Sequence, residues 1–151
     1  MKVLIIYISI HHGNTEGIAK AMAEVLDAKL VKPSEIEADT LSEYDLVGFG
    51  SGSYFWQHHN ELLDLVKGMP HLHKKAFIFS TRGGGPAWLS HRVLKKALLT
   101  NGFDVIGEFS CKGFDTYGAL RLIGGINKGK PDEKDLENAK RFAVALKQTI
   151  G

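Results

Sequence analysis

A buried strand, a polar glycine-containing loop and a helix start follow one another in the first 26 residues. Residues 2–8 read Lys-Val-Leu-Ile-Ile-Tyr-Ile, an apolar and largely β-branched run that is typical of a strand buried on both faces. The apolar residues of segment 16–26 recur instead at helical spacing: Ile18, Met22, Val25 and Leu26. The loop between them therefore meets a helix N-terminus, where free backbone N–H groups and the positive end of the helix dipole favour an anion such as phosphate.

The composition is that of an ordinary globular protein. Of the 151 residues, 44% are hydrophobic and 24% are charged, so we expect one domain over residues 1–151 with a sizeable core. The formal net charge of +2 is too small to indicate a nucleic-acid partner or an anionic membrane surface.

Cysteine usage and the lengths of the apolar runs bear on the compartment. The single cysteine, Cys111, excludes an internal disulfide and favours a reducing compartment. The first apolar run is too short for a signal peptide, and no stretch approaches the roughly 18 apolar residues of a membrane span. We therefore expect a cytoplasmic protein with no membrane partner.

Strand-like and helical patterns alternate along the rest of the chain. The further strand-like runs are 28–32, 44–50, 76–80 and 103–109, of which the first is weak, stopped by Pro33 and typical of an edge strand. Helical patterns cover 61–67, 87–100 and 132–147, with a short helical turn in the acidic segment 35–43. This alternation predicts an α/β fold, a doubly wound five-stranded parallel sheet with helices on both faces.

Loops rich in glycine and hydroxyl residues are predicted at one edge of this sheet. Ligands of doubly wound sheets bind beyond the carboxyl ends of the strands, where the strand order reverses. Gly13 follows the first strand, Gly50 and Gly52 follow the third, and three glycines at 83–85 follow the fourth. We therefore expect these three loops to form a single site.

The first loop and two later segments resemble the flavodoxin family. The family's first loop is rich in Ser and Thr and ends Thr-Gly-Asn-Thr, where this chain has His12-Gly13-Asn14-Thr15. The later segments are Gly-Phe-Asp-Thr at 113–116 and Lys-Pro-Asp-Glu-Lys-Asp-Leu at 130–136. The resemblance covers essentially the whole chain and implies strand order 2-1-3-4-5, with FMN bound where the strand order reverses.

The resemblance also implies cofactor-binding residues in all three loops. The first loop would hold the FMN phosphate through Ser9, Ile10, His11, His12, Gly13, Asn14 and Thr15. The second loop would form one wall of the isoalloxazine pocket with Ser51, Gly52, Ser53, Tyr54, Phe55 and Trp56. The third loop would form the other wall with Ser80, Thr81, Arg82, Gly83 and Gly84.

Three features depart from the family pattern. His12 takes the place of the usual threonine and Ile10 that of a small hydroxyl residue, so phosphate binding would depend on backbone N–H groups and on protonatable His11 or His12. The stacking tyrosine of the third loop is absent, and Trp88 and His91 lie nearby in the sequence. Flavodoxins are usually strongly acidic, whereas this chain is mildly basic, so partner recognition by an acidic face is not indicated.

Several side chains allow two interpretations. Trp88 either covers the second face of the flavin ring or packs in the core at a helix start. Arg82 either lies near the flavin, where a cation would raise the reduction potential, or is a solvated surface residue. His58 and His59 are either cation-binding or proton-relay groups at the flavin rim or surface residues at a helix start.

Metal and thiol chemistry are not expected. The histidine pairs lack a His-x-x-x-His spacing, a thiolate cluster and a carboxylate partner, so we predict no metal site. Cys111 has no evident base or second thiol, which favours a buried structural cysteine.

The pattern favours an FMN-binding electron carrier that exchanges electrons with a reductase or an iron–sulfur protein and with acceptor enzymes, as a monomer or weak dimer. The alternative is an FMN-dependent NAD(P)H:quinone-type oxidoreductase, in which the loop of about 20 residues from Cys111 to Pro131 would cap a substrate. A third possibility is a non-redox binding module that has lost FMN.

Overall fold

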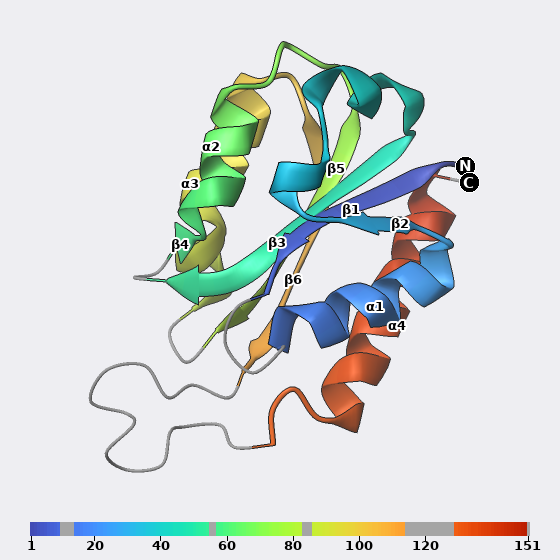
Figure 1. The fold of residues 1–151 in the computed structure, drawn as a ribbon. Helices are drawn as coiled ribbons and strands as arrows, with labels where there is room; N and C mark the ends of the chain where they lie inside the picture. The colour runs from blue at the N-terminus through green and yellow to red at the C-terminus, as the bar shows by residue number, and fades with distance from the viewer. Residues whose placement is uncertain (10–13, 55–56, 83–85, 114–128, 151) are drawn as a thin grey trace.

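A parallel sheet forms the centre of the molecule (Figure 1). The computed structural model describes residues 1–9, 14–54, 57–82, 86–113 and 129–150. The five main strands are β1 (Val3–Ile8), β2 (Lys29–Val31), β3 (Leu46–Tyr54), β5 (Lys75–Arg82) and β6 (Asp104–Lys112). Their order in the sheet is β2-β1-β3-β5-β6, and every neighbouring pair is parallel. The predicted order 2-1-3-4-5 and the edge position of the second strand are therefore confirmed.

A short strand outside this order was not predicted. β4 (Gln57–His58) pairs antiparallel with the end of β3, with Ser53 opposite His58 and Tyr54 opposite Gln57. Two residues are too few to show a periodic pattern, and this strand exists only because β3 extends far enough to pair with it.

Helices cover both faces of the sheet, as predicted (Figure 1). α1 (Asn14–Leu26) and α4 (Glu133–Ile150) lie on one face, and α2 (Asn60–Lys67) and α3 (Ala87–Thr100) lie on the other. The predicted helix 87–100 matches α3 at both ends. Two 3₁₀ helices, Pro33–Glu35 and Ala38–Glu43, occupy the segment where one short helical turn was predicted. No helix in the described part of the chain is both long and apolar enough to cross a membrane.

Successive side chains of β3 and β5 point to opposite faces of the sheet, and this divides the core into two layers. Phe77 and Phe79 of β5 belong to the layer beneath α1 and α4, whereas Phe49 of β3 belongs to the layer beneath α2 and α3. In the register of the sheet, Gly48 lies opposite Phe77 and Gly50 opposite Phe79. A Cβ atom at Gly48 would lie 2.3 Å from the nearest ring atom of Phe77, and one at Gly50 would lie 2.1 Å from that of Phe79, so the two rings fill the space that the glycines leave.

Three strands run further toward their carboxyl ends than the local pattern indicated. β3 continues to Tyr54, β5 to Arg82 and β6 to Lys112. Gly50 and Gly52 therefore lie within β3, and the expectation that they belong to a loop after this strand is wrong. Residues 114–128, most of the predicted loop between Cys111 and Pro131, lie outside the described residues.

Candidate functional site

The start of α1 and the end of β5 meet at the carboxyl edge of the sheet. The hydroxyls of Thr15 and Thr81 form a hydrogen bond of 2.9 Å across 66 residues of sequence. Both side chains are buried, with 2% and 4% of their surfaces exposed. The structure thus brings together one residue from the predicted phosphate loop and one from the predicted third loop.

Ser9 caps the first helix. Its hydroxyl oxygen accepts a hydrogen bond of 3.1 Å from the backbone N–H of Glu16, and its side chain is half-buried. This bond satisfies one of the N–H groups that α1 leaves without a helical partner. Because a hydroxyl can accept and donate at the same time, Ser9 can also donate a hydrogen bond to a ligand at the helix N-terminus.

Asn14 connects the first helix to the end of β6. A Cβ atom at Gly113 would lie 2.6 Å from the Asn14 amide nitrogen, so the glycine backbone packs directly against this side chain. The backbone N–H of Gly113 also donates to the Arg82 carbonyl at 2.9 Å. Segments from β1, α1, β5 and β6 are therefore in contact at one edge.

Ser51 has a role in the fold itself. Its side chain is fully buried, its hydroxyl donates to the Gly52 carbonyl at 2.7 Å, and it accepts from the His59 N–H at 3.0 Å. His59 in turn caps α2, since its Nδ1 accepts from the Glu61 N–H at 3.1 Å. The interpretation of His59 as a helix-start residue is confirmed, and Ser51 fixes that helix start to the end of the sheet.

The remaining predicted site residues are placed as far as the structure describes them. Ser53 and Tyr54 lie in the last part of β3, and Gly52 precedes them. Eight predicted residues lie outside the described residues: Ile10, His11, His12, Gly13, Phe55, Trp56, Gly83 and Gly84.

A line of hydrogen bonds runs from Arg82 into the protein beside this edge. Arg82 Nε donates to Ser110 Oγ at 3.1 Å, and Ser110 Oγ lies 2.9 Å from Ser80 Oγ. Ser80 Oγ lies 2.7 Å from His91 Nε2, and His91 Nδ1 lies 3.0 Å from Glu108 Oε1. Because a carboxylate can only accept, Nδ1 carries the proton, and Nε2 accepts from the Ser80 hydroxyl. Arg82 is half-buried and held by Ser110, so it is not a freely solvated side chain.

Electrostatics keep this line of groups in one protonation state. Burial lowers the pKa of His91 below its ordinary value, and the hydrogen bond to Glu108 offsets part of that effect. Partial burial alone would raise the pKa of Glu108, but Lys95, whose Nζ lies 2.9 Å from Oε2, and His91 together lower it. At neutral pH the imidazole is therefore neutral and the carboxylate ionised.

The order Ser80–His91–Glu108 is also that of a hydrolase triad. Ser80 and His91 are almost completely buried, with 0% and 1% of their surfaces exposed. A nucleophilic serine must be reached by its substrate, so this arrangement positions Arg82 and the strand ends and does not support acyl transfer.

His58 is a buried histidine. Only 1% of its surface is exposed, and its Nε2 donates to the Phe79 carbonyl at 3.0 Å. Its Nδ1 is buried and has no hydrogen-bond partner among the described residues. Burial, with a smaller contribution from His91, lowers the pKa of His58 to about 4. The interpretation of His58 as a surface residue is wrong, because its polar ring is held inside the protein by the end of β5.

Trp88 is not a core residue. Its side chain is 67% exposed in the first turn of α3, so the core interpretation is wrong. The other interpretation, that it covers a flavin ring, stays a prediction.

The prediction that Cys111 is a buried structural residue is confirmed. Its side chain is 6% exposed, and burial raises the pKa of the thiol to about 12. At pH 8 we expect the native protein to react with a disulfide reagent about a thousandfold more slowly than the unfolded chain, because both access and the thiolate fraction are reduced. The rate is measured by absorbance with and without guanidinium, and comparable rates would contradict this placement.

No three His, Cys, Asp or Glu side chains in the described ranges gather where they could hold a metal ion. Among the described residues discussed above, those at the carboxyl edge offer hydroxyls, an amide and the guanidinium of Arg82.

Comparison with known proteins identifies the family. A family model described as a flavodoxin domain matches residues 4–103. The chain belongs to the flavodoxin family. An uncharacterized protein of Methanocaldococcus jannaschii is 46% identical over 148 residues, which cover 97% of this chain and 98% of that protein.

Solved flavodoxins share the fold. Oxidised flavodoxin 2 from Bacillus cereus superposes with a TM-score of 0.75 at 21% identity, and 99% of each chain is covered. A flavodoxin from the domain Archaea has a TM-score of 0.70 at 16% identity, also with 99% of each chain covered. Rubredoxin oxygen:oxidoreductase from Desulfovibrio gigas has a TM-score of 0.74 at 22% identity, and the match covers 99% of this chain and 36% of that one.

The sequence analysis did not predict the row of hydrogen bonds that runs from Arg82 to Glu108. It missed Ser110 and Glu108, and it did not predict that His91 is buried. One signal was present in the sequence. Ser110 directly follows the fifth predicted strand, 103–109, as Ser80 ends the fourth, and the sheet register pairs the two serines. Two serines in register on neighbouring buried strands indicate a paired polar contact.

Proposed function

We propose that this flavodoxin-family protein binds FMN at the carboxyl edge of its sheet and carries electrons in the cytoplasm between a reductase or iron–sulfur protein and acceptor enzymes. The observation that carries the proposal is the hydrogen bond between Thr15 and Thr81. It joins the N-terminus of α1 to the end of β5, which are the places where a phosphate and a flavin ring would be held in this family.

The donors at this edge fit a phosphate. Ser9 and Thr15 place hydroxyls at the N-terminus of a 13-residue helix, whose positive end favours an anion. We propose that residues 9–15 hold the phosphate and that residues 51–56 and 80–84 form the two sides of the ring pocket.

Bound FMN would supply one- and two-electron transfer, and the protein would supply its binding site and charge. Ser110 holds Arg82 at the end of β5, so the guanidinium would add a positive charge at the edge of the pocket. A positive charge favours a reduced, anionic flavin over the neutral oxidised one. Hydrogen bonds from Ser110 to Ser80, and from Ser80 to His91, keep Ser110 in place and thereby fix Arg82.

The names of similar structures agree with a redox role. Rubredoxin oxygen:oxidoreductase contains a unit with the same fold within a longer chain, and the B. cereus protein was solved as an oxidised flavodoxin. We extend to this chain the general property of acting with redox partners.

Titration with FMN tests the proposal. Thr15→Ala removes a buried hydroxyl at the proposed phosphate site, so we expect FMN to bind about 5- to 150-fold more weakly, equivalent to 1–3 kcal/mol. The affinity is measured from quenching of flavin fluorescence. Thr149→Ala is the matched control, since Thr149 is an exposed residue near the end of α4 whose hydroxyl donates to the Ala145 carbonyl, and this variant should bind FMN like the wild type. Equal affinities of Thr15→Ala and wild type would show that the phosphate lies elsewhere.

Two further outcomes separate the alternatives. A chain that binds no FMN would support a non-redox module. Oxidation of NAD(P)H with a quinone and no added reductase would support the FMN-dependent oxidoreductase. The carrier predicts FMN binding with little turnover in that assay.

A further inference from the structure

The outer side of α3 combines exposed apolar and basic side chains. Four large apolar side chains are strongly exposed in the described part of the chain, and two of them, Trp88 at 67% and Leu99 at 53%, are on this helix. They are 11 residues apart, which is three turns at about 3.6 residues per turn, so they lie on the same side of the helix. Exposed apolar groups gathered on one side indicate a contact surface.

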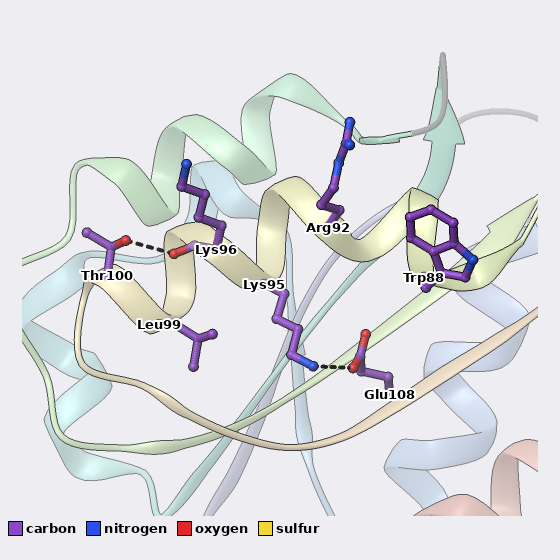
Figure 2. Close-up of a pocket in the computed structure, with 7 residues that line it drawn as sticks. All are labelled: Trp88, Arg92, Lys95, Lys96, Leu99, Thr100 and Glu108. Carbon is purple, nitrogen blue, oxygen red and sulfur yellow. Dashed lines mark hydrogen bonds and ion pairs between the residues drawn. The ribbon is translucent and has the colours of Figure 1, made fainter.

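Basic residues lie between these two apolar side chains along the helix. Arg92, Lys95 and Lys96 lie between Trp88 and Leu99, and α3 contains no aspartate or glutamate. Figure 2 shows Arg92 and Lys96 projecting from one side of the helix and Lys95 reaching to Glu108 on the other. Lys95 is paired with Glu108. No carboxylate in the described part of the chain forms an ion pair with Arg92 or Lys96, so these two carry uncompensated positive charge.

A groove of about 420 Å³ follows the same side of the helix. It is lined by Trp88, Leu99 and the basic residues of α3 together with Glu108 of β6 (Figure 2). Its wall is fixed, because Glu108 is held both by Lys95 and by the buried imidazole of His91. A preformed groove requires little ordering when a partner binds.

The groove begins beside the candidate cofactor site. Trp88 lies in the first turn of α3, six residues after Arg82 at the carboxyl edge of the sheet. From Trp88 to Leu99 the helix rises about 16 Å, which suits the small interface of a transient electron-transfer complex.

We propose that this surface, formed by Trp88, Arg92, Lys96 and Leu99, docks an acidic iron–sulfur protein and places it beside the flavin. The inference rests on the proposed electron-carrier function. Charge complementarity favours an acidic partner, because two cations between exposed apolar side chains match carboxylates around an apolar centre. The proposed electron-carrier function makes that partner an iron–sulfur protein. The chain's net charge of +2 is too low to favour a nucleic acid, whose binding requires neutralising many phosphates.

The test measures binding of a strongly acidic plant-type [2Fe–2S] ferredoxin to the FMN-loaded full chain by titration calorimetry. Both proteins are oxidised, so no electrons move. We expect binding at low ionic strength that weakens with added salt. Arg92→Glu/Lys96→Glu should weaken it at least about tenfold, and Trp88→Ala about fivefold.

The matched control is Arg141→Glu/Lys147→Glu, which reverses the same two residue types on α4 across the sheet. It should stay within about twofold of wild type, because these exposed side chains lie on the opposite face. Equal weakening by both double variants would overturn the proposal, as would absence of ferredoxin binding by the wild type at low salt. Tighter binding of single-stranded oligodeoxythymidine or anionic vesicles than of ferredoxin, abolished by Arg92→Glu/Lys96→Glu, would also overturn it.

Failure of docking can be distinguished from failure of the proposed function. Flavin-fluorescence titration of Arg92→Glu/Lys96→Glu should give the wild-type FMN affinity, because neither residue belongs to the proposed cofactor site. A variant that keeps FMN but loses ferredoxin supports docking on α3. A wild type that binds FMN but not ferredoxin overturns the docking inference and leaves the cofactor proposal standing.

Discussion

Gly50→Ala is expected to lower the free energy of unfolding by about 3 kcal/mol. The added Cβ would lie 2.1 Å from the nearest ring atom of Phe79, which is directly opposite in the sheet. The ring cannot swing away easily, since Phe79 is fully buried and stacks on Phe77 at 6.1 Å between centroids. Relief would require β3 and β5 to separate, or the ring to leave its rotamer.

Urea unfolding followed by circular dichroism measures this effect. With a denaturant slope of about 2 kcal/mol per molar, the midpoint should fall by roughly 1.5 M. Gly17→Ala is the matched control. Gly17 lies within α1, and its Cβ would be 4.0 Å from a Leu136 methyl group, an ordinary van der Waals distance. The alanine should therefore raise the free energy of unfolding by about 0.5–1 kcal/mol through helix propensity.

A second substitution tests whether the clash with the Phe79 ring causes this loss of stability. Phe79→Leu makes room for the new Cβ, so Gly50→Ala/Phe79→Leu should be more stable than the sum of the two single losses indicates. Additive losses would show that the damage from Gly50→Ala has another origin, such as reduced flexibility of the β3 backbone.

Acidification from pH 7.5 to pH 4 is expected to remove about 3 kcal/mol of stability through His58. The unfolded imidazole takes up its proton near pH 6.5, whereas burial lowers the folded pKa to about 4. The unfolded chain therefore binds more protons in this window, and stability falls as the pH falls. Above about pH 6.5 the contribution is fully present, and below about pH 4 it is lost.

The measurement compares urea midpoints between pH 7.5 and pH 4 in wild type and His58→Gln. Glutamine can donate to the Phe79 carbonyl as His58 Nε2 does, but it does not titrate. The free energy of unfolding of His58→Gln should therefore fall by about 3 kcal/mol less than that of the wild type over this range. Exposed His73→Gln serves as the control and should keep the wild-type pH dependence. The same pH dependence in His58→Gln and wild type would show that other groups, such as His91 and Glu108, carry the acid sensitivity.

Much of the fold could be predicted because local signals agree with the tertiary structure. α3 matched its prediction at both ends, since Pro86 precedes it and Asn101-Gly102 follows it. The strands were predicted to end too early, because the polar residues Ser51, Thr81 and Ser110 follow the apolar runs while the ladder of hydrogen bonds continues through them. Pairing between strands, which local periodicity does not report, determines where each strand stops.

The sequence could predict which loops form the site, but it could not predict the hydrogen bonds between their side chains. The rule for doubly wound sheets placed the loops after the first and fourth predicted strands at one edge, and the family resemblance named Thr15 and Thr81 within them. The structure joins these two residues by a hydrogen bond. The hydrogen bonds from Arg82 through Ser80 to Glu108 link residues 28 and 17 positions apart, and no local pattern encodes such distances. His58 was misplaced because a histidine near a helix start is usually solvated, and only the tertiary structure shows that the Phe79 carbonyl accepts a hydrogen bond from its ring.

The glycines of β3 also determine how the sheet aligns while it forms. Both neighbours of β3 in the main sheet are parallel to it, so no tight turn fixes the alignment as it would in a hairpin. A slip by one residue would turn Gly48 and Gly50 to the other face and bring side chains beneath the rings of Phe77 and Phe79. A one-residue misalignment of the central strand is thus excluded sterically.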